Sequence, residues 1–191
     1  FSTTYTDDVN DGSEDTTQIV PFENNLIPKF KYLLQFKRIL WGAGDWNNPT
    51  NLYWTNTDNE HDWSIDYYEP IGEDEGTIIT GLSVLGDYLI VFKEDSIWYI
   101  NPYIPQTLSA SDLISITEHR ISGEYGCISG FTVFHTSMGG SNGIIFADKD
   151  KGICFMAGTT IIPLADKIIT DWAGLNKNYL FNAYGVYDEE N

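Results

Sequence analysis

The chain has 191 residues, of which 28 are acidic and 10 are basic, giving a formal net charge of −18. This balance argues against specific nucleic-acid binding and against attachment to an anionic membrane surface, because both depend on cationic side chains. The longest apolar runs, such as residues 88–92, are too short to cross a bilayer, and the 15% aromatic content with 17 glycines favours a folded β protein over disorder.

Residues 1–28 are polar and acidic, and we expect a lead-in segment or part of a preceding structural unit, with one candidate strand at 16–22. The chain begins with Phe1 and not with Met. We therefore expect it to be processed, trimmed or cut from a longer protein.

The segment from residue 30 predicts a series of short strands. Two apolar strands flank a basic turn at Lys37 and Arg38, residues 47–50 form a turn, and residues 51–56 and 62–71 supply a third and a fourth strand. Residues 77–100 then predict another strand pair with a polar turn at 93–96.

This pattern repeats. Leu33, Phe36 and Leu40 recur 49 residues later as Leu82, Leu85 and Leu89, and the order appears again within residues 127–158. A four-stranded unit that recurs every 40–55 residues is typical of a β-propeller blade. We therefore predict an all-β fold of four-stranded antiparallel blades with one short helix. The blades are expected at residues 30–76, 77–125 and 126–165, with part of another at 177–191.

Ring closure is open to two interpretations. The N-terminal segment could complete the last blade of a four-bladed propeller, or the chain could be a slice of a larger one. The end of the sequence just after an expected strand favours the slice.

The second strand of each unit, at about 38–44, 88–93 and 143–148, is apolar on successive residues, so we expect cover on both faces. An outer strand at 113–121 alternates instead. The helix is expected at 164–174, ending at Gly174. The candidate core residues are Leu40, Trp54, Leu89, Trp98, Ile145 and Ile153.

No motif predicts an enzyme, a catalytic residue or a cofactor. The segment 126–130 is expected to begin a strand rather than a nucleophile elbow, and Asn142–Gly143 is interpreted as a hairpin turn rather than part of a phosphate loop. The acidic runs at 7–15, 73–75 and 188–190 are interpreted as solvated loops, with paired glycosidase carboxylates as the alternative.

Metal binding is not expected either. Cys127 and Cys154 belong to no CxxC pair, and we expect buried free thiols, with a disulfide as the alternative. A calcium loop starting at Asp7 would place Val9 at a ligand position. Trp46 and Trp63 fall in expected loops and are the candidate aromatic residues of a binding face.

Residues 38–63 combine a strand ending in Gly-x-Gly, an "NPTNLYW" turn and strand, and an acidic loop closing in Asp-Trp. Together with the Ile-Thr-Gly-Leu and "LIVFK" strands and the segment 124–168, this resembles the β-propeller virion proteins that form the nozzle or hub of short-tailed phage tails. The resemblance covers residues 30–187.

The resemblance implies a structural protein of the virion tail, made in the bacterial host cytoplasm. Its expected partners are other tail or connector proteins and further copies of itself, in a sixfold ring around the DNA-ejection channel. An acidic channel wall would repel DNA and let it pass without specific binding. The alternatives are a carbohydrate-binding propeller that uses Trp46 and Trp63, and a propeller module for protein interaction.

Overall fold

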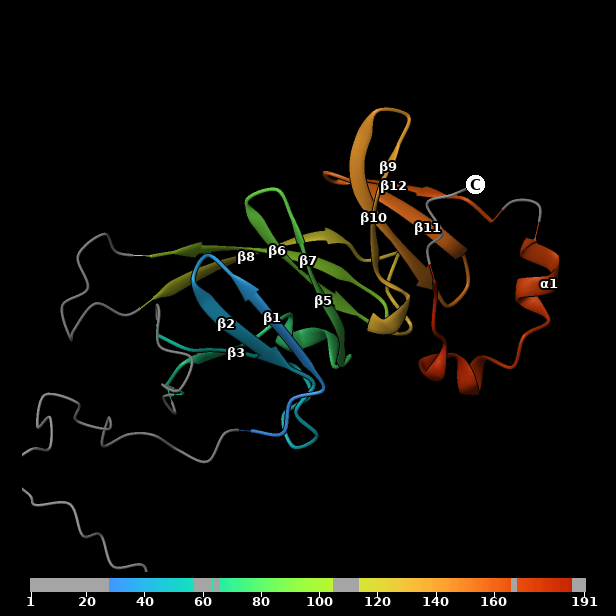
Figure 1. The fold of residues 1–191 in the computed structure, drawn as a ribbon. Coiled ribbons are helices and arrows are strands. Elements are labelled where there is room, and N and C mark those ends of the chain that lie inside the picture. The colour runs from blue at the N-terminus through green and yellow to red at the C-terminus, as the bar shows by residue number, and fades with distance from the viewer. Residues whose placement is uncertain (1–27, 57–62, 64–65, 105–113, 166–167, 187–191) are drawn as a thin grey trace, which may run out of the picture.

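A computed structural model describes residues 28–56, 63, 66–104, 114–165 and 168–186. The described chain forms three four-stranded antiparallel sheets, each built from consecutive strands (Figure 1). This confirms the predicted all-β fold of blade-like four-stranded units. We call the sheets blade 1, blade 2 and blade 3. Blade 1 consists of β1 (Tyr32–Phe36), β2 (Ile39–Ala43), β3 (Asn51–Trp54) and β4 (Tyr68–Pro70). Blade 2 consists of β5 (Ile79–Leu85), β6 (Tyr88–Lys93), β7 (Ile97–Tyr103) and β8 (Ser115–Ser122). Blade 3 consists of β9 (Phe134–Met138), β10 (Ser141–Asp148), β11 (Gly152–Ala157) and β12 (Thr160–Pro163).

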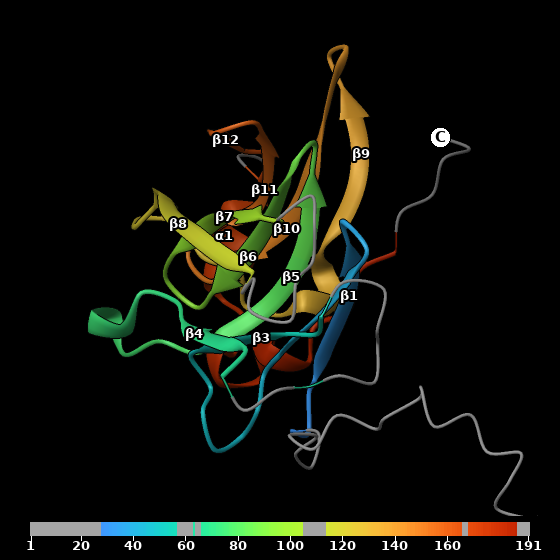
Figure 2. The same ribbon diagram turned by 90° about the vertical axis from the view of Figure 1, so that its left-hand side faces the viewer.

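The blades stack face to face with their strands in the same order. The first strands β1, β5 and β9 lie toward one side of the molecule, and the last strands β4, β8 and β12 lie toward the other (Figure 2). Three 3-10 helices, η1 (Glu73–Glu75), η2 (Gly130–Thr132) and η3 (Lys177–Asn182), and one α-helix, α1 (Ile169–Ala173), lie outside the sheets. In the described part of the chain, no helix has the length and apolar character needed to cross a membrane.

Two hairpin turns differ in how well the sequence predicts them. Lys37 and Arg38 connect β1 to β2 with φ of 51° and 65°, as expected for a tight two-residue turn. The β9–β10 turn, however, lies at Gly139–Gly140, with φ of 59° and 80°. The prediction of a turn at Asn142–Gly143 is therefore wrong. The two glycines adopt positive φ without steric cost, which leaves the next residues free to pair in β10.

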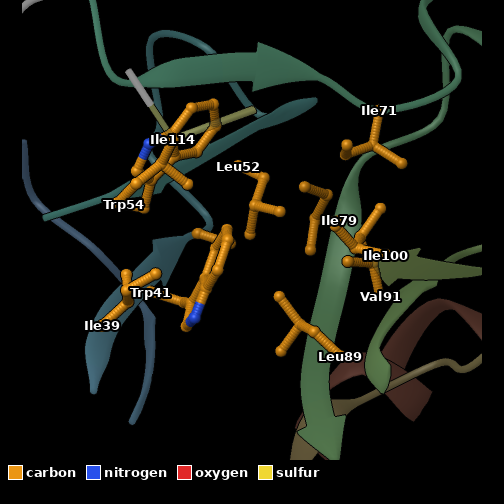
Figure 3. Packing of buried hydrophobic residues seen from close by; sticks show 11 residues of the cluster. Ile39, Trp41, Leu52, Trp54, Ile71, Ile79, Leu89, Val91, Ile100 and Ile114 are labelled. Carbon is orange, nitrogen blue, oxygen red and sulfur yellow. The ribbon is translucent and has the colours of Figure 1, made fainter. Parts of the chain in front are cut away.

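The second strands of the blades form the centre of the core. β6 is buried from its second residue to its last, and β2 and β10 are buried over most of their length. One apolar cluster fills the interface of blades 1 and 2 (Figure 3), and another fills that of blades 2 and 3, where the Phe92 and Phe146 ring centroids lie 5.3 Å apart. The expected cover on both faces is observed for β6 and is less complete for β2 and β10.

The six candidate core residues differ in burial, and Trp98 packs at the edge of the cluster between blades 1 and 2. Trp54 and Leu89 are buried, whereas Leu40, Trp98, Ile145 and Ile153 are half-buried. Leu40 lies between Ile39 and Trp41 in β2, and these two face blade 2, so Leu40 points to the opposite face. Ile145 and Ile153 likewise lie on the face of blade 3 that points away from blade 2.

The C-terminal predictions need two corrections. The helix is shorter than residues 164–174, because Leu164 still donates a backbone hydrogen bond to Ile153 of the sheet, although it does end at Gly174 as expected. The expected strand of a fourth unit is not formed by residues 179–186, which belong to η3 and an irregular segment. Residues 187–191, like the candidate strand at 16–22 and the calcium loop at 7–12, lie outside the described residues.

Residues 126–130 do not begin a strand as predicted. Cys127 N–H donates to the carbonyl of Lys93 at 2.8 Å, and Ile128 N–H donates to that of Ala147 at 2.9 Å. The segment therefore connects blades 2 and 3 by pairing with one strand of each.

Candidate assembly surfaces

The two candidate tryptophans of a binding face are in different environments. Trp46 is 93% exposed in the β2–β3 loop, beside Asp45, which accepts hydrogen bonds from Asn47 and Asn48. Trp63 is only 5% exposed, and its ring centroid lies 4.7 Å from that of Phe30. The prediction of Trp63 as a binding-face residue is wrong, because the side chain packs against blade 1.

Phe30 and Trp63 cover part of the face of blade 1 that points away from blade 2, and Leu33, which pairs with Gly42 on this face, is 58% exposed. A Cβ atom at Gly42 would lie 2.8 Å from the Phe30 ring, so the absent side chain makes room for that ring. The Phe30 ring also lies 5.3 Å from Tyr53. This cover was not predicted, because Gly42 looks like an ordinary strand glycine in the sequence.

The opposite end of the stack is also incompletely covered. Phe134, Ile145, Phe155 and Ile162 are directly opposed in neighbouring strands, so they share the face of blade 3 that points away from blade 2. We call this the outer face of blade 3. Ile162 is 50% exposed on it.

Equivalent positions in the second strands of the three blades show how a following blade changes the burial of a side chain. The second strands of the three blades can be aligned residue by residue. The spacing of 49 residues between blades 1 and 2 aligns Trp41 with Ile90. Lys93 and Asp148 both end their strands, and this aligns Ile90 with Ile145. Trp41 is 0% and Ile90 is 2% exposed, because the following blade covers each of them. Ile145 is only half-buried.

The C-terminal segment, residues 168–186, crosses the outer face of blade 3 without filling it. Its contacts include a hydrogen bond from Trp172 Nε1 to the Lys149 carbonyl at 3.1 Å and one from Gly185 N–H to the Phe131 carbonyl at 3.1 Å. A mainly apolar cavity of about 320 Å³ remains between this segment and the sheet. The segment also exposes large apolar side chains, which include Tyr179, Phe181, Tyr184 and Val186.

A buried charged side chain at the end of the second strand binds the linker that enters its blade. In blade 2, Lys93 Nζ donates to the carbonyls of Ile71 and Gly72 at 2.7 and 2.9 Å. In blade 3, Asp148 Oδ2 accepts from Gly126 N–H at 2.9 Å. Opposite charges thus serve the same purpose, because one linker presents carbonyl groups and the other presents an N–H group.

Lys93 belongs to a polar cluster at the blade 1–blade 2 junction. Its Nζ lies 3.4 Å from Glu75 Oε2, and Arg120 forms an ion pair with Oε1 at 2.9 Å. Ser96 donates to Glu75 Oε2 at 2.5 Å, and Trp98 Nε1 donates to the same oxygen at 3.3 Å. The cluster connects η1 to strands β7 and β8.

Burial and charge oppose each other in this cluster. Burial raises the pKa of Glu75, but the hydrogen bond from Ser96 and the charges of Lys93 and Arg120 outweigh it and leave the pKa below its ordinary value. Burial lowers the pKa of Lys93, and the Glu75 carboxylate offsets part of that shift. Burial raises the pKa of Glu118, whose carboxylate accepts a hydrogen bond from Gly72 N–H.

The first strands of the three blades carry no Asp, Glu, Lys or Arg. β5 lies close to blade 3: Ser83 Oγ lies 3.1 Å from His135 Nε2 of β9, and a Cβ atom at Gly81 would lie 2.9 Å from Gly130 Cα of η2. The acidic channel wall that the resemblance implies is therefore not made by these strands.

The described residues offer little reactive chemistry. Both cysteines are buried free thiols, as expected, and burial raises the pKa of Cys127 to about 11 and that of Cys154 to about 12. Both are protonated at neutral pH and hence poor nucleophiles. No three His, Cys, Asp or Glu side chains in the described ranges come together as a metal site.

No protein-family model matches the chain, and a search of the curated proteins found no match. The fold and the surfaces define a protein of stacked four-stranded blades, with apolar side chains partly exposed on both terminal faces and a cavity over the outer face of blade 3.

Proposed function

We propose that this protein is a structural component of a phage tail, part of a nozzle or hub ring around the channel through which DNA leaves the virion. The observation that carries the proposal is the outer face of blade 3. It continues the apolar surface by which each preceding blade receives the next, yet the C-terminal segment leaves a cavity of about 320 Å³ over it.

The blade interfaces indicate what this face would receive. Blade 3 packs Ile144 and Phe146 of its second strand against blade 2, and blade 2 uses Leu89 and Val91 in the same way against blade 1. A further blade with two large apolar residues in its second strand would pack against the outer face of blade 3 in the same way. This blade would not be blade 1 of another copy, because Phe30 and Trp63 already occupy the corresponding face there.

The side of the stack where the first strands gather also suits DNA passage. Affinity for the DNA backbone comes mainly from Lys and Arg side chains that neutralise phosphates. Strands β1, β5 and β9 themselves have none of these residues, and the cationic side chains next to them in sequence are Lys31, Lys37 and Arg38, which flank β1. A wall of uncharged strands would then take the place of the acidic channel wall that the resemblance implied.

Native mass spectrometry of the protein from its natural source tests the proposal. We expect a ring of about six copies whose subunits are heavier than 21.6 kDa. A lone monomer of 21.6 kDa with no virion association would contradict it and favour a small propeller module for protein interaction.

A further inference from the structure

A groove of about 590 Å³ opens between blades 2 and 3, at the ends of their hairpins. Blade 2 supplies an apolar and aromatic wall, and blade 3 supplies a polar one. The lining residues are Leu85, Gly86, Asp87, Tyr88, Ile90, Tyr99, Ile121, Asn142, Gly158 and Thr159. Its volume lies in the range of small-molecule binding sites.

The groove between blades 2 and 3 has no counterpart at the equivalent place between blades 1 and 2. Tyr88 begins β6 at the position that Ile39 occupies in β2, 49 residues earlier. Ile39 is fully buried between blades 1 and 2, whereas Tyr88 is 44% exposed. The same interface is therefore filled in one blade pair and open in the other.

Small residues on blade 3 explain why the groove stays open. The interface of blades 2 and 3 is tightly packed at Phe92 and Phe146, whose ring centroids are 5.3 Å apart. Toward the hairpin ends, blade 3 continues with Asn142 in β10 and with the turn residue Gly158. No large apolar side chain on blade 3 lines the groove opposite the tyrosines.

Contacts between aromatic rings support the aromatic wall. The rings of Tyr88 and Tyr99 meet edge to face with centroids 4.9 Å apart, and His119 stacks on Tyr99, also at 4.9 Å. Tyr99 is thereby fixed from two directions, and Tyr88 presents its exposed part to the groove. Around these rings, Asp87, Asn142 and Thr159 supply a carboxylate, an amide and a hydroxyl group.

We propose that this groove binds a neutral oligosaccharide. A sugar ring has C–H groups that pack on the negatively polarised face of an aromatic ring, and hydroxyl groups around its edge that need hydrogen-bond partners. The tyrosine wall and the polar side chains match these two requirements. Asp87 in the lining and the net charge of −18 disfavour anionic ligands.

Binding can be measured with the full 191-residue chain by isothermal titration calorimetry, using cellobiose, maltotriose and chitotriose as neutral probes and trigalacturonate as the anionic probe. We expect saturable binding of at least one neutral probe and none of trigalacturonate. The groove lies within a single chain, so this result does not depend on ring assembly.

Variants on both walls locate the site. Tyr88→Ala is expected to weaken binding about tenfold, corresponding to ~1.4 kcal/mol, while Tyr88→Phe keeps most of the affinity because the ring remains. Asn142→Ala weakens binding from the opposite wall. The control is Tyr103→Ala, because Tyr103 is 66% exposed in β7 but does not line the groove.

Three results would overturn the proposal. They are no saturable binding of any neutral probe, tighter binding of trigalacturonate than of the neutral probes, or equal affinities for the Tyr88→Ala and Tyr103→Ala variants. Thermal melts of all variants establish that each is folded, and should Tyr88→Ala unfold, the Asn142→Ala variant decides alone.

Discussion

Lys93 and Asp148 show how single side chains order the blades. Each ends the second strand of its blade, is buried, and hydrogen-bonds the backbone of the incoming linker. A buried backbone carbonyl or N–H group without a partner is costly. The sign of the charge at this position therefore follows from which backbone group the linker presents.

Replacing Lys93 by Met should destabilise the protein strongly, because the carbonyls of Ile71 and Gly72 and the Glu75 carboxylate all lose a buried partner. We expect a cost of about 3 to 5 kcal/mol in the free energy of unfolding, measured by urea denaturation. Lys149→Met is the matched control, since the Lys149 side chain is exposed. Equal midpoints for the two variants would show that Lys93 is not a structural residue.

Glu75 should make stability depend on pH in the acid range. Its pKa is lowered in the folded protein, so its contribution is complete above its unfolded-state pKa of about 4.3 and is lost as the pH falls through the lower folded-state value. Glu75→Gln is thus expected to be destabilising at pH 7 and progressively less so below about pH 4.

Urea denaturation of wild type and Glu75→Gln across this pH range measures the difference. Glu118→Gln provides a control of opposite sign, because burial raises the pKa of Glu118. A Glu75→Gln penalty that is constant from pH 7 to pH 3 would mean that the carboxylate charge is not what matters.

At the level of the elements, patterns with a single interpretation were predictable. Apolar runs around Lys37–Arg38 admit one hairpin, and the continuous apolar second strands admit only cover on both faces. The β9–β10 turn was missed because two turn signals lie three residues apart, Gly139–Gly140 and Asn142–Gly143. Local propensity cannot choose between them, whereas the pairing of Ile144 and Ile145 with β9 can.

The position of that turn can be checked by substitution. Gly140→Ala should cost about 1 to 2 kcal/mol, because φ of 80° is unfavourable for a residue with a Cβ atom. Asn142→Thr should have little effect, because residue 142 lies in a strand. Thermal denaturation of both variants distinguishes the two registers, and a larger loss for Asn142→Thr would place the turn where the sequence motif predicted it.

The candidate surfaces were less predictable than the strands. Trp46 and Trp63 look alike in the sequence, yet one is exposed and the other packs against Phe30, which precedes it by 33 residues. The groove beside Tyr88 depends on small residues about 54 to 70 positions away in the chain, at Asn142 and Gly158. Such juxtapositions follow from how the blades stack and not from any local pattern.

At the level of the whole molecule, the three blades form an asymmetric stack. Phe30 and Trp63 cover part of the face of blade 1 that points away from blade 2, where Leu33 is 58% exposed, whereas the outer face of blade 3 retains a cavity and exposes Ile162. Exposed apolar surface of this kind is typical of interaction sites. We therefore propose that assembly proceeds from the outer face of blade 3.

Hydroxyl-radical footprinting, comparing the isolated 191-residue chain with the assembled protein from its natural source, tests this proposal most directly. We expect Tyr184, which is 74% exposed, and Ile162 to become protected on assembly, while Trp46, at 93% exposed, remains labelled. If Tyr184 and Ile162 are oxidised as readily in the assembly as in the isolated chain, the outer face of blade 3 does not receive a further blade.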